Sequence, residues 1–402
     1  MRTEQEVNRA IEQYSDMILR LCTVYLKNTQ DAEDVFQTVF LKYAMSRQIF
    51  ESPEHEKAWL IRVASNQCRD VLKSFFRRHT VSLQEASQAQ TGMTPESLGV
   101  LEAMKNEPAY GQPVLYYMSD GCTSGPTVAD DLGFYTEAGL TAEGFKGTSY
   151  TEALGTQQAT IAVGHIATML VPITNGVDLT FVGGGHIGCK SLYVLADSDY
   201  NTTEDLKGTQ VSVPNGIGAS DYNITCLLLD ADGINPQTDL TLTQVSSDAC
   251  VAAMENGEIS AALLSDTFAY AMVKEGKLKC IRSLLDTDFA DENCCVLAMN
   301  RTFVQENPVH AKKTVQAVQK AHAWMRENAA EATQLLLDRG WNGGSYEMNI
   351  MINTSLQFGL ADDFTAVSLK DVVERYVRLG LITSMDNVDE IMDLAWNPVL
   401  NN

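Results

Sequence analysis

The chain has 402 residues, 45% of them hydrophobic, with 29 Lys+Arg against 52 Asp+Glu and a net charge of −23. This length and composition suit about two or three folded domains and exclude a chain that is disordered throughout. The negative charge excludes nucleic-acid binding through the overall field, so any such contact has to be local. Residues 1–90 contain 12 Lys+Arg and 12 Asp+Glu, which leaves 17 and 40 for the rest of the chain. The two parts are therefore expected to meet different partners.

The first 80 residues predict three helices. Apolar residues recur at helical spacing over 7–25 and 32–43, and a polar turn separates the two segments. A third helix is expected from Pro53 to about Phe76, because Ser52 suits an N-cap and Pro53 the first helical position. Residues 86–109 are polar and predict a linker that contains a short helix near 96–105.

Two strings in these helices carry a family resemblance. DAEDVFQTVFLK at 31–42 and KAWLIRVASNQCRD at 57–70 closely resemble region 2 of extracytoplasmic-function sigma factors, over about residues 5–85. The resemblance implies an all-α module, 1–85, that binds RNA polymerase core and the −10 element of promoter DNA. Cations on one face of the third helix agree with it, because they form a local phosphate-binding stripe.

The resemblance also implies roles for particular residues. The residues expected to contact DNA are Arg62, Asn66, Arg69, Lys73, Arg77 and Arg78. The residues expected to dock on polymerase are Asp31, Glu33, Asp34 and Gln37. A solvated basic face is the plainer alternative for the third helix. The second, helix-turn-helix domain with which such sigma factors read the −35 element does not follow in this sequence.

From Val114 onward short apolar strands alternate with helices. The predicted strands are 114–118, 140–145, 160–163, 179–182, 192–195, 210–213 and 261–264. After Pro308 the pattern is helical, at 310–328, 329–339 and 369–379. This alternation predicts parallel sheets with crossover helices.

The second part of the chain resembles the substrate-binding proteins of ABC importers of the nitrate/sulfonate/taurine and thiamine-precursor (NMT1/THI5-like) type. The strings DDLGFYTEAGL at 130–140, NGVDL at 175–179 and DLKGTQVSVP at 205–214 carry this resemblance, which spans about 112–400. It implies a two-lobed α/β fold of the type 2 periplasmic-binding-protein kind over 110–402. Lobe one would comprise 110–204 and 299–402, and lobe two 205–298.

In such a fold a small molecule binds between the lobes, where loops meet at the carboxyl ends of strands. Gly-, Ser- and Thr-rich loops let backbone N–H groups approach a ligand, and helix N-termini favour negative charge. These features favour an anion, and the resemblance implies a thiamine precursor as the other candidate. The residues expected to bind it are Asp120, Thr123, Ser124, Thr148, Ser149, His165, His186, Gly216, Gly218, Ser220 and Asp266.

Other kinds of site are not expected. The nine cysteines are odd in number and lack C-x-x-C spacing, which predicts neither a disulfide framework nor a metal site. The run 183–188 fits G-x-G-x-x-G, but a strand rather than a helix follows it, so no dinucleotide cofactor is predicted. No catalytic motif is present, and the chain is not expected to be an enzyme.

The N-terminus has no apolar segment and the longest apolar stretch is interrupted, so the sequence predicts a cytoplasmic protein without a membrane span. The first functional hypothesis is ligand-responsive transcription initiation by a fusion of the two modules. The alternative is an importer's solute-binding protein with an adventitious sigma-like N-terminus. In that case an ABC permease would be its partner. The relatives of its second domain lie outside the cytoplasm.

Overall fold

The computed structural model describes residues 2, 4–26, 29–46, 50, 56–57, 59–61, 63–64, 67 and 103–400. The chain separates into two compact units, 1–96 and 97–402, and each is treated by itself. The predicted DNA contacts Arg62, Asn66, Arg69, Lys73, Arg77 and Arg78 all lie outside the described residues. The predicted polymerase contacts Asp31, Glu33, Asp34 and Gln37 lie on a described helix, but their side chains do not belong to the described part.

In the first unit, all of the described residues that belong to regular secondary structure are helical. Helices α1 (Glu4–Leu26) and α2 (Thr29–Met45) pack through a small apolar core, and the described residues between 56 and 67 are also helical. The core residues on α1 and α2 are Ala10, Tyr14, Ile18, Cys22, Ala32, Val35, Val39, Phe40 and Tyr43. The complete three-helix module therefore stays a prediction.

A buried carboxylate joins the three segments of this unit. Glu56 is 4% exposed; it accepts hydrogen bonds from Arg9 Nη2 at 2.7 and 2.9 Å and from the Tyr43 hydroxyl. Burial alone would raise the pKa of Glu56, but the hydrogen bonds from Arg9 and Tyr43 outweigh it and lower that pKa. The predicted third segment is thus tied to both α1 and α2.

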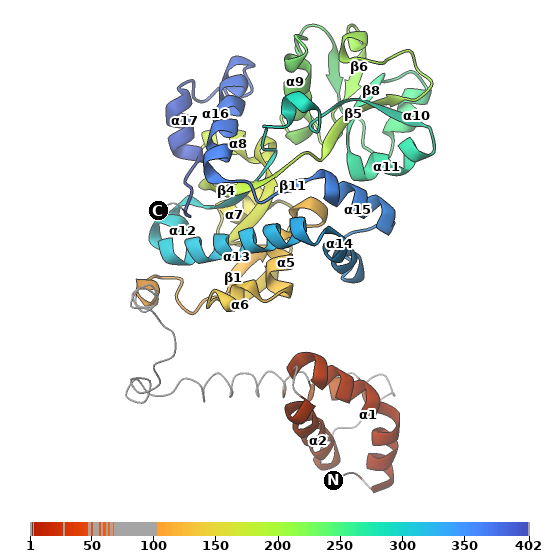
Figure 1. Ribbon diagram of the computed structural model, residues 1–402, viewed down its shortest axis with the longest axis vertical. Coiled ribbons are helices and arrows are strands. Elements are labelled where there is room, and N and C mark those ends of the chain that lie inside the picture. The colour runs from red at the N-terminus through yellow and green to blue at the C-terminus, as the bar shows by residue number, and fades with distance from the viewer. Residues whose placement is uncertain are drawn as a thin grey trace. The chain divides into compact units, whose positions relative to one another are not determined.

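The second unit contains two mixed sheets within the described residues (Figure 1). The first sheet has the order β11-β4-β10-β3-β1-β2. Its strands are β1 (Val114–Tyr117), β2 (Ala142–Phe145), β3 (Ile161–His165), β4 (Leu179–Ile187), β10 (Cys295–Asn300) and β11 (Gln357–Phe358). The second sheet has the order β7-β6-β8-β5-β9. Its strands are β5 (Lys190–Leu195), β6 (Gln210–Ser212), β7 (Thr241–Thr243), β8 (Ala261–Ser265) and β9 (Leu278–Ser283).

Helices cover both faces of the first sheet, which buries its apolar side chains on two sides. The helices on one face are α5 (Gly125–Asp131), α6 (Phe134–Glu137), α12 (Arg301–Glu306) and α13 (Pro308–Glu327). Those on the other face are α7 (Tyr150–Gly155), α8 (Ile166–Thr174), α16 (Asp362–Arg378) and α17 (Val388–Ala395). The C-terminal helices α16 and α17 thus pack against the same sheet as α7 and α8.

The second sheet packs against α9 (Ser220–Ala231), α10 (Cys250–Glu255) and α11 (Asp266–Lys274). Helices α14 (Ala329–Asp338) and α15 (Tyr346–Ser355) follow α13, and α15 contacts α11 of the second lobe. Three short 3-10 turns complete the described elements: η1 (Gly121–Thr123), η2 (Thr203–Leu206) and η3 (Thr287–Phe289).

Three expectations about the sheets need correction. The sheets are mixed rather than parallel, because β10 runs antiparallel to β3 and β4, and β5 runs antiparallel to β8 and β9. His186, expected in a ligand-binding loop, lies inside β4 together with the three glycines at 183–185. Strand β5, expected in lobe one, belongs to the second sheet, so the chain first crosses between lobes at 188–189. Hydrophobic periodicity in a sequence shows neither the direction in which a strand runs nor the sheet that it joins.

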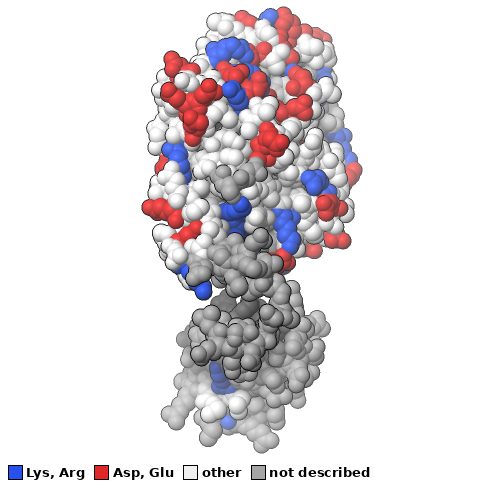
Figure 2. Space-filling model, turned by 60° about the vertical axis from the view of Figure 1, so that its left-hand side comes forward, with Lys and Arg blue, Asp and Glu red and all other residues white. Residues whose placement is uncertain are grey.

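Acidic and basic side chains are interspersed on the face of the second unit drawn in Figure 2. Among the described helices, none combines the length and apolar character that crossing a membrane requires.

Candidate functional site

The two lobes of the second unit are joined at two crossings. The first is the two-residue step from β4 to β5 through Gly188 and Cys189, and the second is the segment from β9 to β10 that ends at Cys294. Gly188 has a φ of 93° and Cys189 a φ of 108°. A residue with a Cβ rarely adopts such a φ, so the surrounding structure has to hold Cys189 in place.

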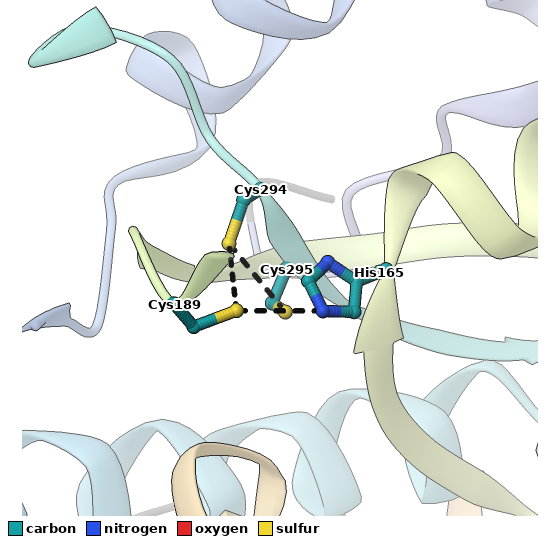
Figure 3. Close-up of side chains that lie close together, drawn as sticks. All are labelled: His165, Cys189, Cys294 and Cys295. Carbon is teal, nitrogen blue, oxygen red and sulfur yellow. Dashed lines mark hydrogen bonds between the residues drawn. The ribbon is translucent and has the colours of Figure 1, made fainter. Parts of the chain in front are cut away.

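Four side chains with sulfur or nitrogen donors meet at these crossings (Figure 3). The Cys189 Sγ lies 3.4 Å from His165 Nε2 and 4.0 Å from Cys294 Sγ, which lies 3.7 Å from Cys295 Sγ. His165 ends β3 and Cys295 begins β10, so both belong to the central strands of lobe one. We call His165, Cys189, Cys294 and Cys295 the hinge cluster.

The thiols of the hinge cluster influence one another's protonation. Burial raises the pKa of the Cys294 thiol, but hydrogen bonds with Cys189 and Cys295 outweigh burial and lower it to about 6. Burial and the neighbouring thiols hold the pKa of Cys295 well above its ordinary value. Thiolates a few ångström apart repel each other, so the cluster favours a single negative charge. A hydrogen bond from Cys122, which lies in η1, lowers the pKa of Cys189.

A cavity of about 590 Å³ opens between β5, β9 and α11 of lobe two and α15. Its walls are largely apolar, with Tyr193, Tyr270, Leu285, Met351 and Ile352 among the lining residues. This volume lies in the range of small-molecule sites, which are mostly apolar with few polar groups. We call this space the interlobe pocket.

Asp266, the first residue of α11, is a partly buried charged group in the wall of the interlobe pocket. Its Oδ1 accepts hydrogen bonds from the Ser191 hydroxyl at 2.7 Å and the Tyr193 hydroxyl at 2.8 Å. Its Oδ2 has no hydrogen-bond partner among the residues that the structure describes. Burial raises the pKa of Asp266, although the two hydroxyls act in the opposite direction. A buried oxygen without a partner is costly, so it can attract a donor from a ligand.

An ion pair lies at the edge of the interlobe pocket. Lys274 of α11 and Glu347 of α15 approach to 2.7 Å, with side chains that are 56% and 68% exposed. An exposed pair of this kind contributes little to stability. It can nevertheless break and re-form cheaply when the two lobes move.

Two of the predicted ligand residues, His165 and Asp266, lie at this interlobe region. Asp266 is joined directly to the hinge cluster, because its backbone N–H donates to the Cys189 carbonyl at 3.2 Å. The others make contacts of a different kind. Ser124 is buried and donates to the Gly121 carbonyl, Thr123 donates to the Asp120 carbonyl, and Asp120 is exposed.

The remaining predicted ligand residues serve the backbone or the core. Ser149 caps α7 by accepting from the Glu152 N–H, and Thr148 is exposed beside it. Gly216 and Gly218 have positive φ values in the turn before α9. The Ser220 hydroxyl bonds Asp221, the residue that follows it.

His186 is fully buried in β4, and its ring contacts the ring of Phe358 edge-on, while Phe358 also contacts His322. The ring of Phe358 lies 5.5 Å from that of His186 and 5.7 Å from that of His322, measured between centroids. Within the described residues, both ring nitrogens of His322 lack hydrogen-bond partners, and burial lowers the pKa of this histidine to about 3. Both histidine rings are fully buried.

The pKa of His322 predicts a pH dependence of stability. Because the pKa of His322 is about 3 in the folded chain and near 6.5 in the unfolded chain, only the unfolded chain protonates this imidazole as the pH falls from about 7.5 to about 5. This group alone should cost about 2 kcal/mol of stability between about pH 7.5 and pH 5. His322→Met should remove that part of the loss, measured as the difference between urea unfolding curves of the two proteins at both pH values. Equal pH dependence would show that His322 titrates in the folded protein.

Sequence reasoning missed Cys189, Cys294, Cys295, Ser191 and Tyr193 as site residues. The cysteines were not expected to form a metal site, because their spacing along the chain matches no metal-binding pattern. The adjacent pair Cys294-Cys295 was a visible signal, but its partners lie more than 100 residues away. Only the crossing of two strands brings them together.

The comparisons with known proteins agree with this geometry. The family model described as NMT1/THI5 like matches residues 123–332, and the model of sigma-70 region 2 matches residues 10–79. No curated protein matches the chain. Similar solved structures are the alkanesulfonate-binding protein SsuA from Xanthomonas axonopodis pv. citri bound to MOPS and the periplasmic nitrate-binding protein NrtA from Synechocystis PCC 6803. A third is a ligand-binding component of an ABC-type import system from Staphylococcus aureus with zinc bound.

The structural likeness covers most of each relative. The alkanesulfonate-binding protein is 15% identical over 71% of this chain and 99% of its own, with a TM-score of 0.57. The nitrate-binding protein is 16% identical over 71% and 86%, with a TM-score of 0.56. The Staphylococcus aureus component is 15% identical over 72% and 98%, with a TM-score of 0.55. These identities show a shared fold only. Because the family match extends over more than half of the chain, the chain belongs to the NMT1/THI5-like family, and it carries a sigma-70 region 2 domain ahead of that part.

Proposed function

We propose that this chain is a sensor in which a solute-binding domain controls a sigma region 2 module. The module would bind RNA polymerase core and −10 promoter DNA, and the second unit would bind a small molecule between its lobes. The observation that carries the proposal is the pairing of the two family matches with the interlobe pocket and its incompletely bonded carboxylate. No catalytic step is included.

The pocket chemistry favours one class of ligand. The unpartnered Asp266 Oδ2 calls for a hydrogen-bond donor, such as an amine or the N–H of a heterocycle, and the apolar walls call for a ring or chain attached to it. An aminopyrimidine of the thiamine-precursor kind has both features. A sulfonate group and nitrate offer no hydrogen-bond donor, and the carboxylate would repel either anion.

The glycine turn before α9 also argues against an anion. Asp221 lies in the first turn of α9, where its Oδ2 accepts from the Asn215 N–H at 3.0 Å and its Oδ1 pairs with Lys190. The chain's own carboxylate therefore uses the positive end of this helix. The predicted contacts Gly216, Gly218 and Ser220 then act by shaping the turn.

Ligand binding is tested first, on the full chain. Aminopyrimidines and aryl or alkyl amines should raise the melting temperature, and sulfonates and nitrate should not. Asp266→Asn should weaken the binding of a compound so found by at least about 10-fold, because it removes the charge that attracts the donor. Asp389→Asn, an exposed change of the same chemistry, is the matched control and should have no effect. If the full chain bound sulfonates and did not bind amines, the proposed class of ligand would be rejected.

Polymerase binding is tested next, with the same chain. It should bind RNA polymerase core, and a promoter carrying a −10 element should bind the complex with an affinity that changes at least about 5-fold when the ligand is added. Replacing Arg62, Arg69 and Lys73 together by Ala should abolish promoter binding and leave polymerase binding intact. Retained promoter binding in this variant would contradict the DNA contacts that the sigma region 2 resemblance implies for these three residues.

A second candidate is an importer's solute-binding protein whose sigma-like N-terminus has no role. The nearly complete coverage of the solved binding proteins favours it, since the second unit has the extent of a free-standing domain. Failure of the full chain to bind polymerase, with and without a bound ligand, would support this candidate over the first.

A further inference from the structure

The hinge cluster has the dimensions of a metal site. In a tetrahedral site with metal–sulfur bonds of about 2.3 Å and metal–nitrogen bonds of about 2.0 Å, neighbouring sulfurs lie about 3.8 Å apart and a sulfur and a nitrogen about 3.5 Å apart. Two of the three Sγ–Sγ distances are 3.7 and 4.0 Å, and Cys189 Sγ lies 3.4 Å from His165 Nε2. All four donor atoms lie within 4.8 Å of one another.

Core packing explains this arrangement poorly. A buried cysteine that only fills space behaves as a small apolar residue and needs no polar neighbours. Cys189 instead has a φ of 108°, which costs about 1–3 kcal/mol at a residue with a Cβ, and the turn aims its thiol at an imidazole and a second thiol. Strain that collects donor atoms at one point is typical of a functional site.

We propose that His165, Cys189, Cys294 and Cys295 bind one Zn²⁺ or a similar thiophilic divalent ion. One nitrogen and three sulfur donors form the Cys₃His set of closed structural zinc sites, and thiolates exclude Mg²⁺ and Ca²⁺. Each of the three thiols would lose its proton to solvent as its bond to the metal forms, including that of Cys294, which now donates to the Gly188 carbonyl at 2.6 Å. Four protein ligands leave no open position, so the site is not catalytic.

The position of the site indicates what the metal would do. Cys189 lies in one crossing between the lobes and Cys294 at the end of the other, whereas His165 and Cys295 belong to lobe one. A metal bound to all four would fasten both crossings to lobe one and restrict lobe movement. Through the Asp266 N–H bond to the Cys189 carbonyl, it would also fix the start of α11 beside the interlobe pocket. Metal binding itself does not depend on the proposed function, but this coupling does.

The test is a Co²⁺ titration of the reduced full chain without oxygen. Thiolate–Co²⁺ charge-transfer absorption and strong tetrahedral ligand-field bands should rise to one equivalent and disappear on addition of one equivalent of Zn²⁺. Single variants C189S, C294S and C295S should each weaken binding by more than about 100-fold, since losing even an outer-shell partner costs 10–100-fold. Cys226→Ala and Cys250→Ala, which remove buried thiols elsewhere, are the matched controls and should bind as the parent does.

Two results would overturn the proposal. One is a folded, fully reduced chain whose circular dichroism is unchanged but which gives no charge-transfer band with Co²⁺. The other is an equal loss of the band in the control variants, which would place the bound ion at other thiols. The readout needs neither the pocket ligand nor polymerase, so its failure is distinguishable from failure of the proposed function.

Discussion

Gly185→Ala should destabilise the second unit by about 3 kcal/mol, because overpacking costs 1–3 kcal/mol and backbone cannot move aside as a side chain does. Gly185 lies at a bulge in β4, where the pairing with β10 shifts register between Cys295 and Val296. A Cβ at Gly185 would lie 2.5 Å from the Cys295 carbonyl oxygen and 2.8 Å from its carbonyl carbon. Both strands are central in the sheet, so neither can yield. Urea unfolding should show a lower midpoint with an unchanged slope.

Gly183→Ala, two residues earlier in the same strand, is the matched control. Its Cβ would meet the Gln319 side-chain nitrogen at 3.2 Å, with Val315 Cγ1 at 3.5 Å. A glutamine side chain can shift by a few tenths of an ångström, so the loss should stay below about 1 kcal/mol. Equal losses in the two variants would mean that β10 yields at the bulge and that the tight approach at Gly185 is not a constraint.

Lys190→Met should also have a large effect, about 3–5 kcal/mol, because it leaves a buried carboxylate without its counter-ion. The side chains of Lys190 and Asp221 are 13% and 3% exposed, and their pair joins the first strand after the crossing to the start of α9. The double variant Lys190→Met/Asp221→Asn should recover most of the loss, since Asn keeps an acceptor for the Asn215 N–H. The measurement is the free energy of unfolding of the two variants and the parent. If Lys190→Met were as stable as the double variant, water would have to reach the Asp221 carboxylate.

Several elements could be predicted because their signals are local. The strands at 114–117, 161–165 and 261–265 and the helices after Pro308 follow from apolar periodicity and N-cap residues. Strands β7, β9, β10 and β11 were not predicted. Strand β10 is apolar at almost every position and buried throughout. It therefore lacks the alternation of apolar and polar residues by which a half-buried strand is recognised in a sequence.

The glycine run in β4 shows the limit of local signals most clearly. Three consecutive glycines usually mark a turn, but here each lies against other atoms: Gly183 near Gln319, Gly184 against Thr365 and Leu360, and Gly185 against the Cys295 backbone. Glycine is needed for close approach rather than for turning. Such a requirement depends on the neighbours, which the sequence of the strand does not contain.

The sequence by itself determined the two families, and it singled out Asp266 and His165 as candidate site residues. Motif order and hydrophobic periodicity are short-range properties, and a resemblance needs nothing more. The tertiary structure decided the mixed strand directions, the crossing points at 188–189 and before Cys295, and the meeting of His165, Cys189, Cys294 and Cys295. Donor atoms from segments about 25 to 130 residues apart become neighbours only when both crossings pack against lobe one, and no spacing along the chain records that contact.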